Sequence, residues 1–199
     1  MGTDKSISSR SVGLFDLLVR LPAVLKDVPV IVRGACTGLL AQPNSKTSIG
    51  TVFADRAARY GDRIFLRFGD EEISYAQANA IANRYAAVLA ERGVGRGDVV
   101  GVMERNSPDV VLTMLAAVKC GAVAGMLNHH QREEVLAHSI GLLDASVVVA
   151  EADLIEPIRS SGAQLSGVDL VSVEEFAAAA EDKSTANPAS AKEVQAKDP

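Results

Sequence analysis

The sequence predicts an α/β fold in which a parallel sheet is covered by crossover helices. From residue 98 onward, short apolar runs alternate with longer segments of helical periodicity, and this alternation is typical of right-handed strand–helix–strand units. Small aliphatic residues dominate: Trp is absent and aromatic residues make up only 4% of the chain. Such a composition suits helices packed on parallel strands that are buried on both faces.

A helix, a hairpin and a longer helix precede this alternation. Gly61 is predicted to end the first helix, and Gly69 lies in the turn of the hairpin. Ser74 is a suitable N-cap for the second helix, which ends near Gly93. The predicted ranges are 52–60 for the first helix, 64–68 and 71–73 for the hairpin strands, and 75–92 for the second helix.

The alternating part begins with a buried strand at 98–103. Ser107-Pro108-Asp109 follows it and combines an N-cap, a proline at the first helical position and an acidic residue in the first turn. The helix that starts there should end at Gly121. The remaining predictions are strands at 122–127, 146–150 and 168–173, and helices at 131–143, 152–161 and 174–180.

The two ends of the chain differ from its middle. Between residues 12 and 25, apolar residues recur at helical spacing and predict an amphipathic helix. Residues 181–199 are polar and rich in Ala, Ser, Pro and Lys, which predicts a linker. We therefore expect a helical N-terminal segment at 1–47, an incomplete α/β subdomain at 48–180 and a linker at 181–199.

Charge and hydropathy restrict the partners and the location. The net charge is −5, and the absence of a basic cluster in the globular part argues against nucleic acid as a partner. No run of about 20 apolar residues and no secretory signal is present. We expect a cytoplasmic protein, with peripheral contact to the inner membrane through residues 12–25 as an open possibility.

The cysteines and histidines do not form a recognisable site. Cys36 and Cys120 are far apart in sequence, and Cys120 is predicted to be a buried free thiol. The side chains of His129 and His130 are expected to diverge because the two residues are neighbours. His138 is expected to be a partly buried packing residue of its helix.

Two further segments invite a ligand-binding interpretation. The glycines of Gly93–Asp98 follow a helix and precede a strand, which is the reverse of a dinucleotide-binding loop, so we interpret them as a helix end and a turn. Asn106-Ser107-Pro108 follows the carboxyl end of a parallel strand, where open α/β sheets bind ligands. Helix capping explains these three residues fully.

Several segments together resemble the adenylate-forming acyl-CoA synthetases over about residues 48–150. The similar segments, in order, are Glu72–Asn79 with Ala82–Ala86, Arg92–Val102, Asn106–Pro108 and Lys119–Val123. Met126-Leu127-Asn128, Arg132 and His138 are similar to the fatty-acid-transport and very-long-chain subgroup. The stretch from Arg33 to Lys46 resembles mycobacterial long-chain members.

This resemblance implies a two-step reaction. A long-chain fatty acid would attack ATP to give an acyl-adenylate and pyrophosphate, and coenzyme A would then displace AMP. In the family, the phosphate loop lies just beyond the point where this chain ends, so we expect a fragment that precedes the loop and is inactive alone. ATP, Mg²⁺ and coenzyme A are implied for the full-length enzyme, and no catalytic, cofactor-binding or metal-binding residue is assigned here.

Two alternatives to an enzyme fragment remain open. One is a stand-alone, non-catalytic α/β binding module. The other is a nucleotide-binding oxidoreductase domain, against which the position of the glycines at 93–97 counts.

Overall fold

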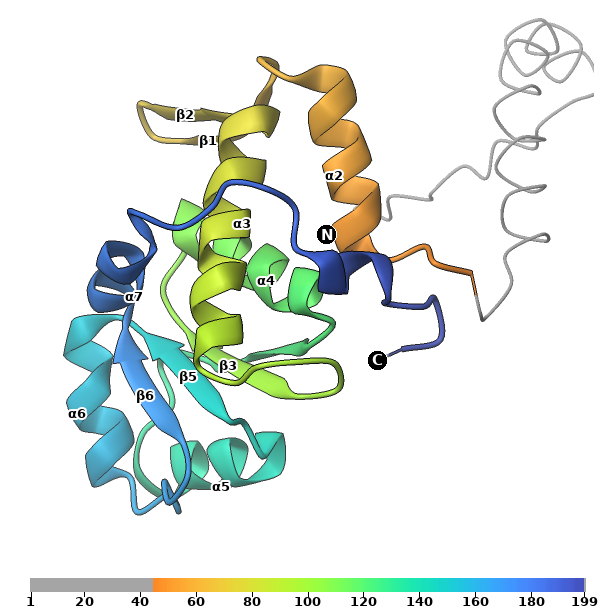
Figure 1. The fold of residues 1–199 in the computed structure, drawn as a ribbon. Helices are drawn as coiled ribbons and strands as arrows, with labels where there is room; N and C mark the ends of the chain where they lie inside the picture. Colours follow the sequence, from red (N-terminus) through yellow and green to blue (C-terminus); the bar gives the residue numbers. More distant parts are fainter. Residues whose placement is uncertain (1–44, 199) are drawn as a thin grey trace, which may run out of the picture. The chain divides into compact units, whose positions relative to one another are not determined.

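The computed structural model describes residues 45–198, which belong to one compact unit (Figure 1). The predicted helix at 12–25 and Cys36 lie outside the described residues. The chain first forms helix α2 (Ile49–Tyr60), the antiparallel hairpin of β1 (Ile64–Phe68) and β2 (Glu71–Ser74), and helix α3 (Tyr75–Glu91). These elements confirm the predicted helix–hairpin–helix order.

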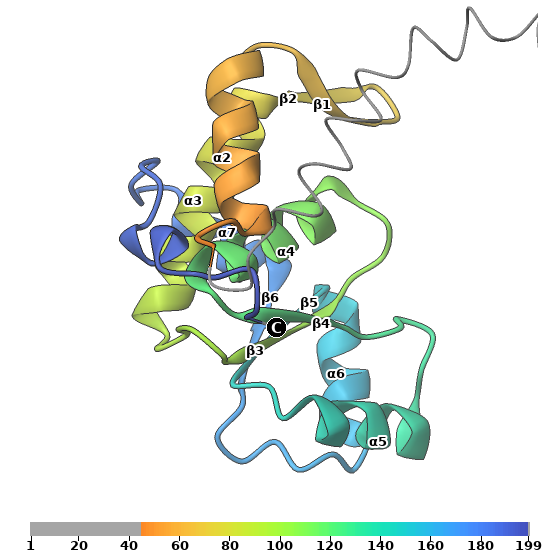
Figure 2. The ribbon, with the colours of Figure 1, turned by 90° about the vertical axis from the view of Figure 1, so that its right-hand side faces the viewer.

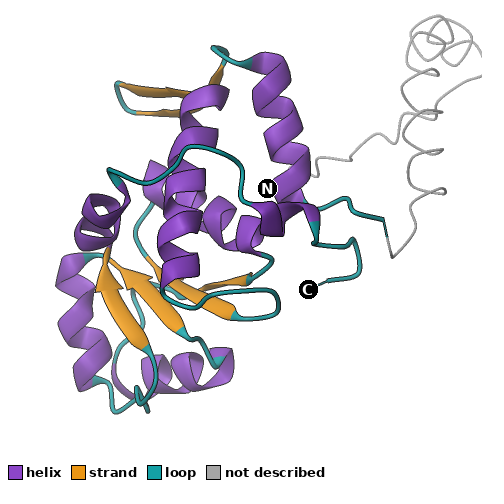
Figure 3. Cartoon of the chain, viewed as in Figure 1, coloured by secondary structure: helices purple, strands orange, loops and turns teal. Residues whose placement is uncertain are grey.

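A four-stranded parallel sheet follows, which confirms the predicted fold class (Figure 3). The strands lie in the order β4-β3-β5-β6, so β3 is central and pairs with β4 on one side and β5 on the other. The elements are β3 (Val99–Met103), α4 (Pro108–Cys120), β4 (Val123–Met126), α5 (Glu133–Leu143), β5 (Val147–Ala150), α6 (Ala152–Ser160), β6 (Asp169–Ser172) and α7 (Val173–Ala180).

Helices cover both faces of this sheet. Figures 1 and 2 show α5 and α6 on one side and α3 and α4 on the other. Successive side chains of a strand point to opposite faces of the sheet, so the core has two parts. Val100 and Val102 pack with α3 and α4, whereas Met103 packs with α5 and α6. On β4, a Cβ at Gly125 would lie 2.5 Å from a methyl group of Leu143, so glycine lets α5 approach the sheet.

Serine caps start four of the helices. Ser48, Ser74 and Ser172 form capping boxes at α2, α3 and α7, and the Ser107 hydroxyl accepts from the backbone N–H of Val110 at the start of α4. Gly121 ends α4 in the left-handed conformation, with φ of 80°. These features confirm the predicted helix boundaries to within about two residues, except that α2 begins three residues before the predicted start at residue 52.

The segment after α7 differs from the prediction. Residues 181–198 were expected to be a linker, but they pack on the helices and contain a short 3-10 helix, η1 (Ala189–Lys192). Ala191 and Val194 are buried, and η1 contacts α4 and α2. The linker prediction was wrong for these residues because a few side chains anchor an otherwise polar segment.

Within residues 45–198, no helix is long and apolar enough to cross a membrane.

Candidate functional site

The candidate site is the edge of the sheet at which the parallel strands end. The segments that leave β3, β4 and β5 there are Glu104–Asn106, Leu127–Arg132 and Glu151–Asp153, while β6 runs directly into α7. Parallel strands bring these segments together at one edge, and open α/β sheets bind ligands outside the carboxyl ends of their strands. The first turns of α4 and α7 add acidic residues, Asp109 in α4 and Glu174 and Glu175 in α7.

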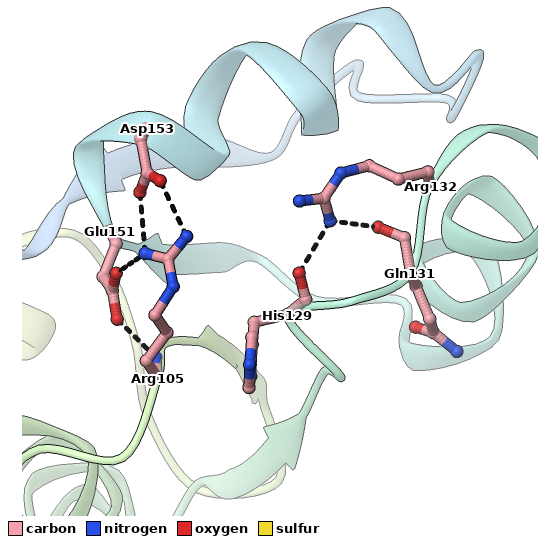
Figure 4. A network of polar contacts seen from close by, with 6 residues as sticks. All are labelled: Arg105, His129, Gln131, Arg132, Glu151 and Asp153. Atoms are coloured by element: carbon pink, nitrogen blue, oxygen red, sulfur yellow. Dashed lines mark hydrogen bonds and ion pairs between the residues drawn. The ribbon is translucent and has the colours of Figure 1, made fainter.

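Arg105 joins the ends of two neighbouring strands (Figure 4). Its guanidinium group bonds to both carboxylate oxygens of Asp153, at 3.0 and 2.7 Å, and pairs with Glu151. Glu151 also accepts a hydrogen bond from the backbone N–H of Arg105. The hydrogen bond from Arg105 lowers the pKa of Asp153. Arg105, Glu151 and Asp153 therefore form a charged clamp, here called the Arg105 clamp, between the segments after β3 and β5. The side chains of Arg105 and Asp153 are partly open to solvent.

Backbone acceptors hold the loop after β4. The guanidinium of Arg132 donates to the carbonyl oxygens of His129 and Gln131, each at 2.6 Å (Figure 4). The side chain of Asn128 accepts from the backbone N–H of His130 at 2.9 Å, which forms a tight turn. This loop has no ion pair with the Arg105 clamp among the described residues.

Two expectations about the histidines were wrong. The rings of His129 and His130 do not diverge, because their centroids lie 4.0 Å apart within the turn that starts at Asn128. His138 is exposed rather than partly buried, since Leu136 and Ile140 supply the packing face of α5. Residues 45–198 contain no group of three His, Cys, Asp or Glu side chains suited to a metal ion.

Glu104 is the least expected group near this edge. It directly follows the central strand, is only 7% exposed, and neither of its carboxylate oxygens has a hydrogen-bond partner among the described residues. Burial, followed by the negative charges of Asp109 and Glu151, raises the pKa of Glu104 to about 8. The carboxyl group is therefore mainly protonated at neutral pH.

A part-buried hydrogen-bonded pair, Tyr85 and Asp109, lies near Glu104. The hydroxyl of Tyr85 on α3 donates to Asp109 in the first turn of α4 at 2.9 Å. Burial, with a further contribution from Asp109, raises the pKa of Tyr85 well above its ordinary value. Ser107 caps α4 as predicted, so Asn106-Ser107-Pro108 has the expected structural role.

Other residues considered in the sequence have structural roles. Cys120 is a free buried thiol, as predicted; it donates to the carbonyl oxygen of Ala86, and burial raises its pKa to about 11. Its thiolate is thus disfavoured at neutral pH. Gly93 and Gly97 have positive φ angles in the turn before β3, which confirms the turn interpretation. Cys120, Gly93 and Gly97 therefore have structural roles.

The sequence analysis did not identify Glu104 or the Arg105 clamp. A usable signal was present, because charged residues follow two predicted strands at equivalent positions: Glu104-Arg105 after one and Glu151 after the other. Neighbouring parallel strands place such residues side by side. The burial of Glu104 has no comparable sequence signal, since it depends on the packing of α3, α4 and α7.

The fold and this edge define an open α/β domain with a charged carboxyl end. A model of the AMP-binding enzyme family matches residues 53–199, and the chain belongs to that family. This confirms the family resemblance described from the sequence.

Curated relatives are consistent with this assignment. A medium/long-chain-fatty-acid–CoA ligase, FadD6, from Mycobacterium tuberculosis is 65% identical over 190 residues, which cover 94% of this chain and 32% of the relative. A Mycobacterium marinum ligase for medium/long-chain fatty acids and 3-oxocholest-4-en-26-oate is 42% identical over 45% of this chain and 16% of the relative. The chain thus spans about a third of FadD6 and a smaller share of the second ligase.

Solved structures show the same fold. A Mycobacterium tuberculosis fatty acyl CoA synthetase matches 72% of this chain and 30% of its own chain, with a TM-score of 0.65 and 27% identity. The N-terminal domain of FACL13 from the same organism matches 72% of this chain and 38% of its own, with a TM-score of 0.66 and 27% identity.

Proposed function

We propose that the chain is part of a medium- or long-chain fatty-acid–CoA ligase. The observation that carries this proposal is the 65% identity to FadD6 across 94% of the chain. The reaction has two steps: the fatty acid carboxylate attacks the α-phosphate of ATP and releases pyrophosphate, and the thiol of coenzyme A then displaces AMP from the acyl-adenylate. The substrates of the whole enzyme are accordingly a fatty acid, ATP and coenzyme A.

Within this enzyme, residues 45–198 serve as scaffold. Their parallel sheet and helical layers hold the carboxyl edge in place, and the Arg105 clamp fixes the segments after β3 and β5. We assign no catalytic or nucleotide-binding residue to this part, and the phosphate-binding groups belong to other parts of the enzyme.

The described residues do not fit the magnesium ion that the reaction requires. Mg²⁺ prefers ionised carboxylates in octahedral geometry. Glu104 is mainly protonated at neutral pH, and Glu151 and Asp153 are already paired with Arg105. No reaction step is therefore derived through a metal ion at this edge.

Pyrophosphate exchange tests the scaffold proposal. The purified chain is incubated with ATP, Mg²⁺, labelled pyrophosphate and palmitate, and exchange into ATP is measured against a reaction without protein. We expect no exchange above that background. Exchange clearly above it would show that the chain itself holds the adenylation site.

We further propose that the enzyme acts in the cytoplasm and contacts the inner membrane through residues 12–25. The apolar spacing of this segment supports the proposal, since an amphipathic helix can lie in the surface of a bilayer. Its charged residues are Asp16 and Arg20, and Lys26 and Asp27 follow it directly, so the charges balance and attraction to anionic lipid should be weak. Flotation with neutral liposomes tests this: deletion of residues 1–47 should abolish flotation, and equal flotation of both forms would contradict it.

A further inference from the structure

Residues 183–198, here called the strap, run across the helical layer of the domain. Figure 1 shows this segment, in dark blue, passing over α3 toward the start of α2. The backbone N–H of Ala196 donates to the carbonyl oxygen of Ser45 at 2.9 Å, so the strap also reaches the beginning of the described chain. Only two apolar side chains of the strap, Ala191 and Val194, are buried. Hydrophobic burial alone is therefore a weak explanation for its position.

Lys119 supplies a stronger anchor. This residue lies in the last turn of α4, is 0% exposed, and donates three hydrogen bonds of 2.8 Å to amide oxygens. Asn79 and Asn83 of α3 provide two of these oxygens, and Asn187 of the strap provides the third. One ammonium group thus joins α4, α3 and the strap at a single point.

Asn83 fixes the geometry of this cluster. It is 1% exposed, its Oδ1 accepts from Lys119, and its Nδ2 donates to the backbone carbonyl of Thr185 in the strap at 2.7 Å. The two roles are compatible with only one orientation of the amide. Asn83 therefore connects Lys119 to the strap a second time, through the main chain.

The charge of Lys119 has no acidic counterpart among the described residues. Within residues 45–198 Lys119 forms no salt bridge, and burial lowers its pKa to about 8. A buried charge needs hydrogen bonds to offset its lost hydration. The amide oxygen of Asn187 is one of three groups that meet this need, so the strap supplies one of the three hydrogen bonds that stabilise the ammonium group in its buried position.

We propose that Lys119 is a buried clasp that fastens the strap to helices α3 and α4 and so fixes its path across the domain. The hydrogen bond between Lys119 and Asn187 is the part of the clasp that can open without disturbing the core. This proposal concerns the path of the chain within the domain and does not rest on the ligase function.

The strap makes further polar contacts: the Ser190 hydroxyl donates to the carbonyl oxygen of Lys119 at 3.1 Å, Asp198 pairs with Arg96, and Lys183 makes an exposed contact with α3. Lys183 pairs with Glu91 at 2.7 Å, but the side chain of Glu91 is 59% exposed. Such surface pairs contribute little to stability. Lys183 is therefore a matched control: it is also a lysine that ties the strap to α3, but through an exposed ion pair.

Hydrogen–deuterium exchange of the full chain at pH 7 tests the clasp. The reporters are the amides of Ala191, Glu193 and Ala196 in the strap, compared with those of β3 and β5 in the sheet. Asn187→Ala should speed exchange in the strap by about tenfold, because it removes one hydrogen bond to a charged group. Lys183→Met should change the exchange rate of the strap amides by less than about threefold. Exchange in the sheet should stay unchanged in both variants.

Introducing a negative charge at residue 187 separates the clasp from ordinary packing. Asn187→Asp keeps the size of the side chain and places a carboxylate opposite the ammonium group, so it should slow exchange in the strap several-fold. The same change in a Lys119→Met background should give no such slowing. Equal strap exchange in the parent, Asn187→Ala and Asn187→Asp forms would overturn the proposal, and so would slowing by Asn187→Asp that persists without Lys119. Because both Asn187 variants change only the strap, the test stands even if Lys119→Met fails to fold.

Discussion

The hydroxyl of Tyr85 donates a 2.9 Å hydrogen bond to the carboxylate of Asp109 and thereby ties α3 to the first turn of α4. Tyr85 is only 5% exposed and Asp109 is half-buried, so the bond is partly shielded from water. Tyr85→Phe keeps the ring but removes the donor and should lower the free energy of unfolding by about 1.5–3 kcal/mol, as for other bonds to charged groups. Urea denaturation at pH 7 measures this change. A loss below about 0.5 kcal/mol would show that the bond is not stabilising.

Glu104 should make stability depend on pH. Its pKa is raised from 4.5 to about 8 in the folded protein. Between these values the folded state keeps a proton that the unfolded chain has lost, so stability falls as pH rises through this window. Glu104→Gln has no titratable group at this position, so this loss of stability with rising pH should be absent in the variant.

The variant should therefore match the parent near pH 4 and exceed it near pH 8 by a few kcal/mol, at about 1.4 kcal/mol per unit of pKa difference. Free energies of unfolding at pH 4, 6 and 8 check this expectation. Glu134→Gln, at an exposed position on α5, is the control for the change in net charge. Parallel pH profiles for the parent and Glu104→Gln would contradict the account of Glu104.

The Arg105 clamp should contribute little to global stability. The side chains of Arg105 and Asp153 are 45% and 63% exposed, and exposed pairs are screened by water and salt. A double-mutant cycle with Arg105→Met and Asp153→Asn should give a coupling within the error of the measurement, and still less in 1 M salt. A strong coupling that persists in 1 M salt would mean that the clamp is more strongly desolvated than its exposure indicates.

Two leucines test where the core lies. Leu89 is 0% exposed in the layer that contains α3, whereas Leu142 on α5 is 73% exposed. Leu89→Ala should lower the free energy of unfolding by about 2–5 kcal/mol, and Leu142→Ala by less than about 0.5 kcal/mol. Thermal or urea unfolding of both variants measures these changes in the free energy of unfolding. Similar losses at the two positions would show that α5 packs against a further surface.

Local signals made much of the fold predictable from the sequence. Ser107-Pro108-Asp109 marks the start of α4, and the burial of strands such as β3 on both faces follows from continuous runs of small aliphatic residues. Parallel pairing then follows from the helical connections. Each of these predictions depends on residues close together in the chain.

The features that could not be predicted depend on residues far apart. Lys119 meets Asn83 and Asn187 only after α3, α4 and the strap have packed, so the polar composition of the strap alone suggested a linker. The burial of Glu104 likewise depends on helices from three parts of the chain. The ring contact of His129 and His130 depends on the turn that Asn128 forms, not on the sequence spacing of the two histidines.

The central claim is that this chain forms the scaffold of a fatty-acid–CoA ligase, and a chimera tests it most directly. The aligned 190 residues of Mycobacterium tuberculosis FadD6 are replaced by the corresponding residues of this chain, which are 65% identical. Formation of palmitoyl-CoA from palmitate, ATP and coenzyme A is then measured, with the same chimera carrying Leu89→Ala as the control for a weakened core. We expect the chimera to form palmitoyl-CoA at a rate within about tenfold of the parent ligase, a difference of about 1.4 kcal/mol in the barrier. A chimera that folds as stably as the parent ligase but makes no palmitoyl-CoA would contradict the assignment.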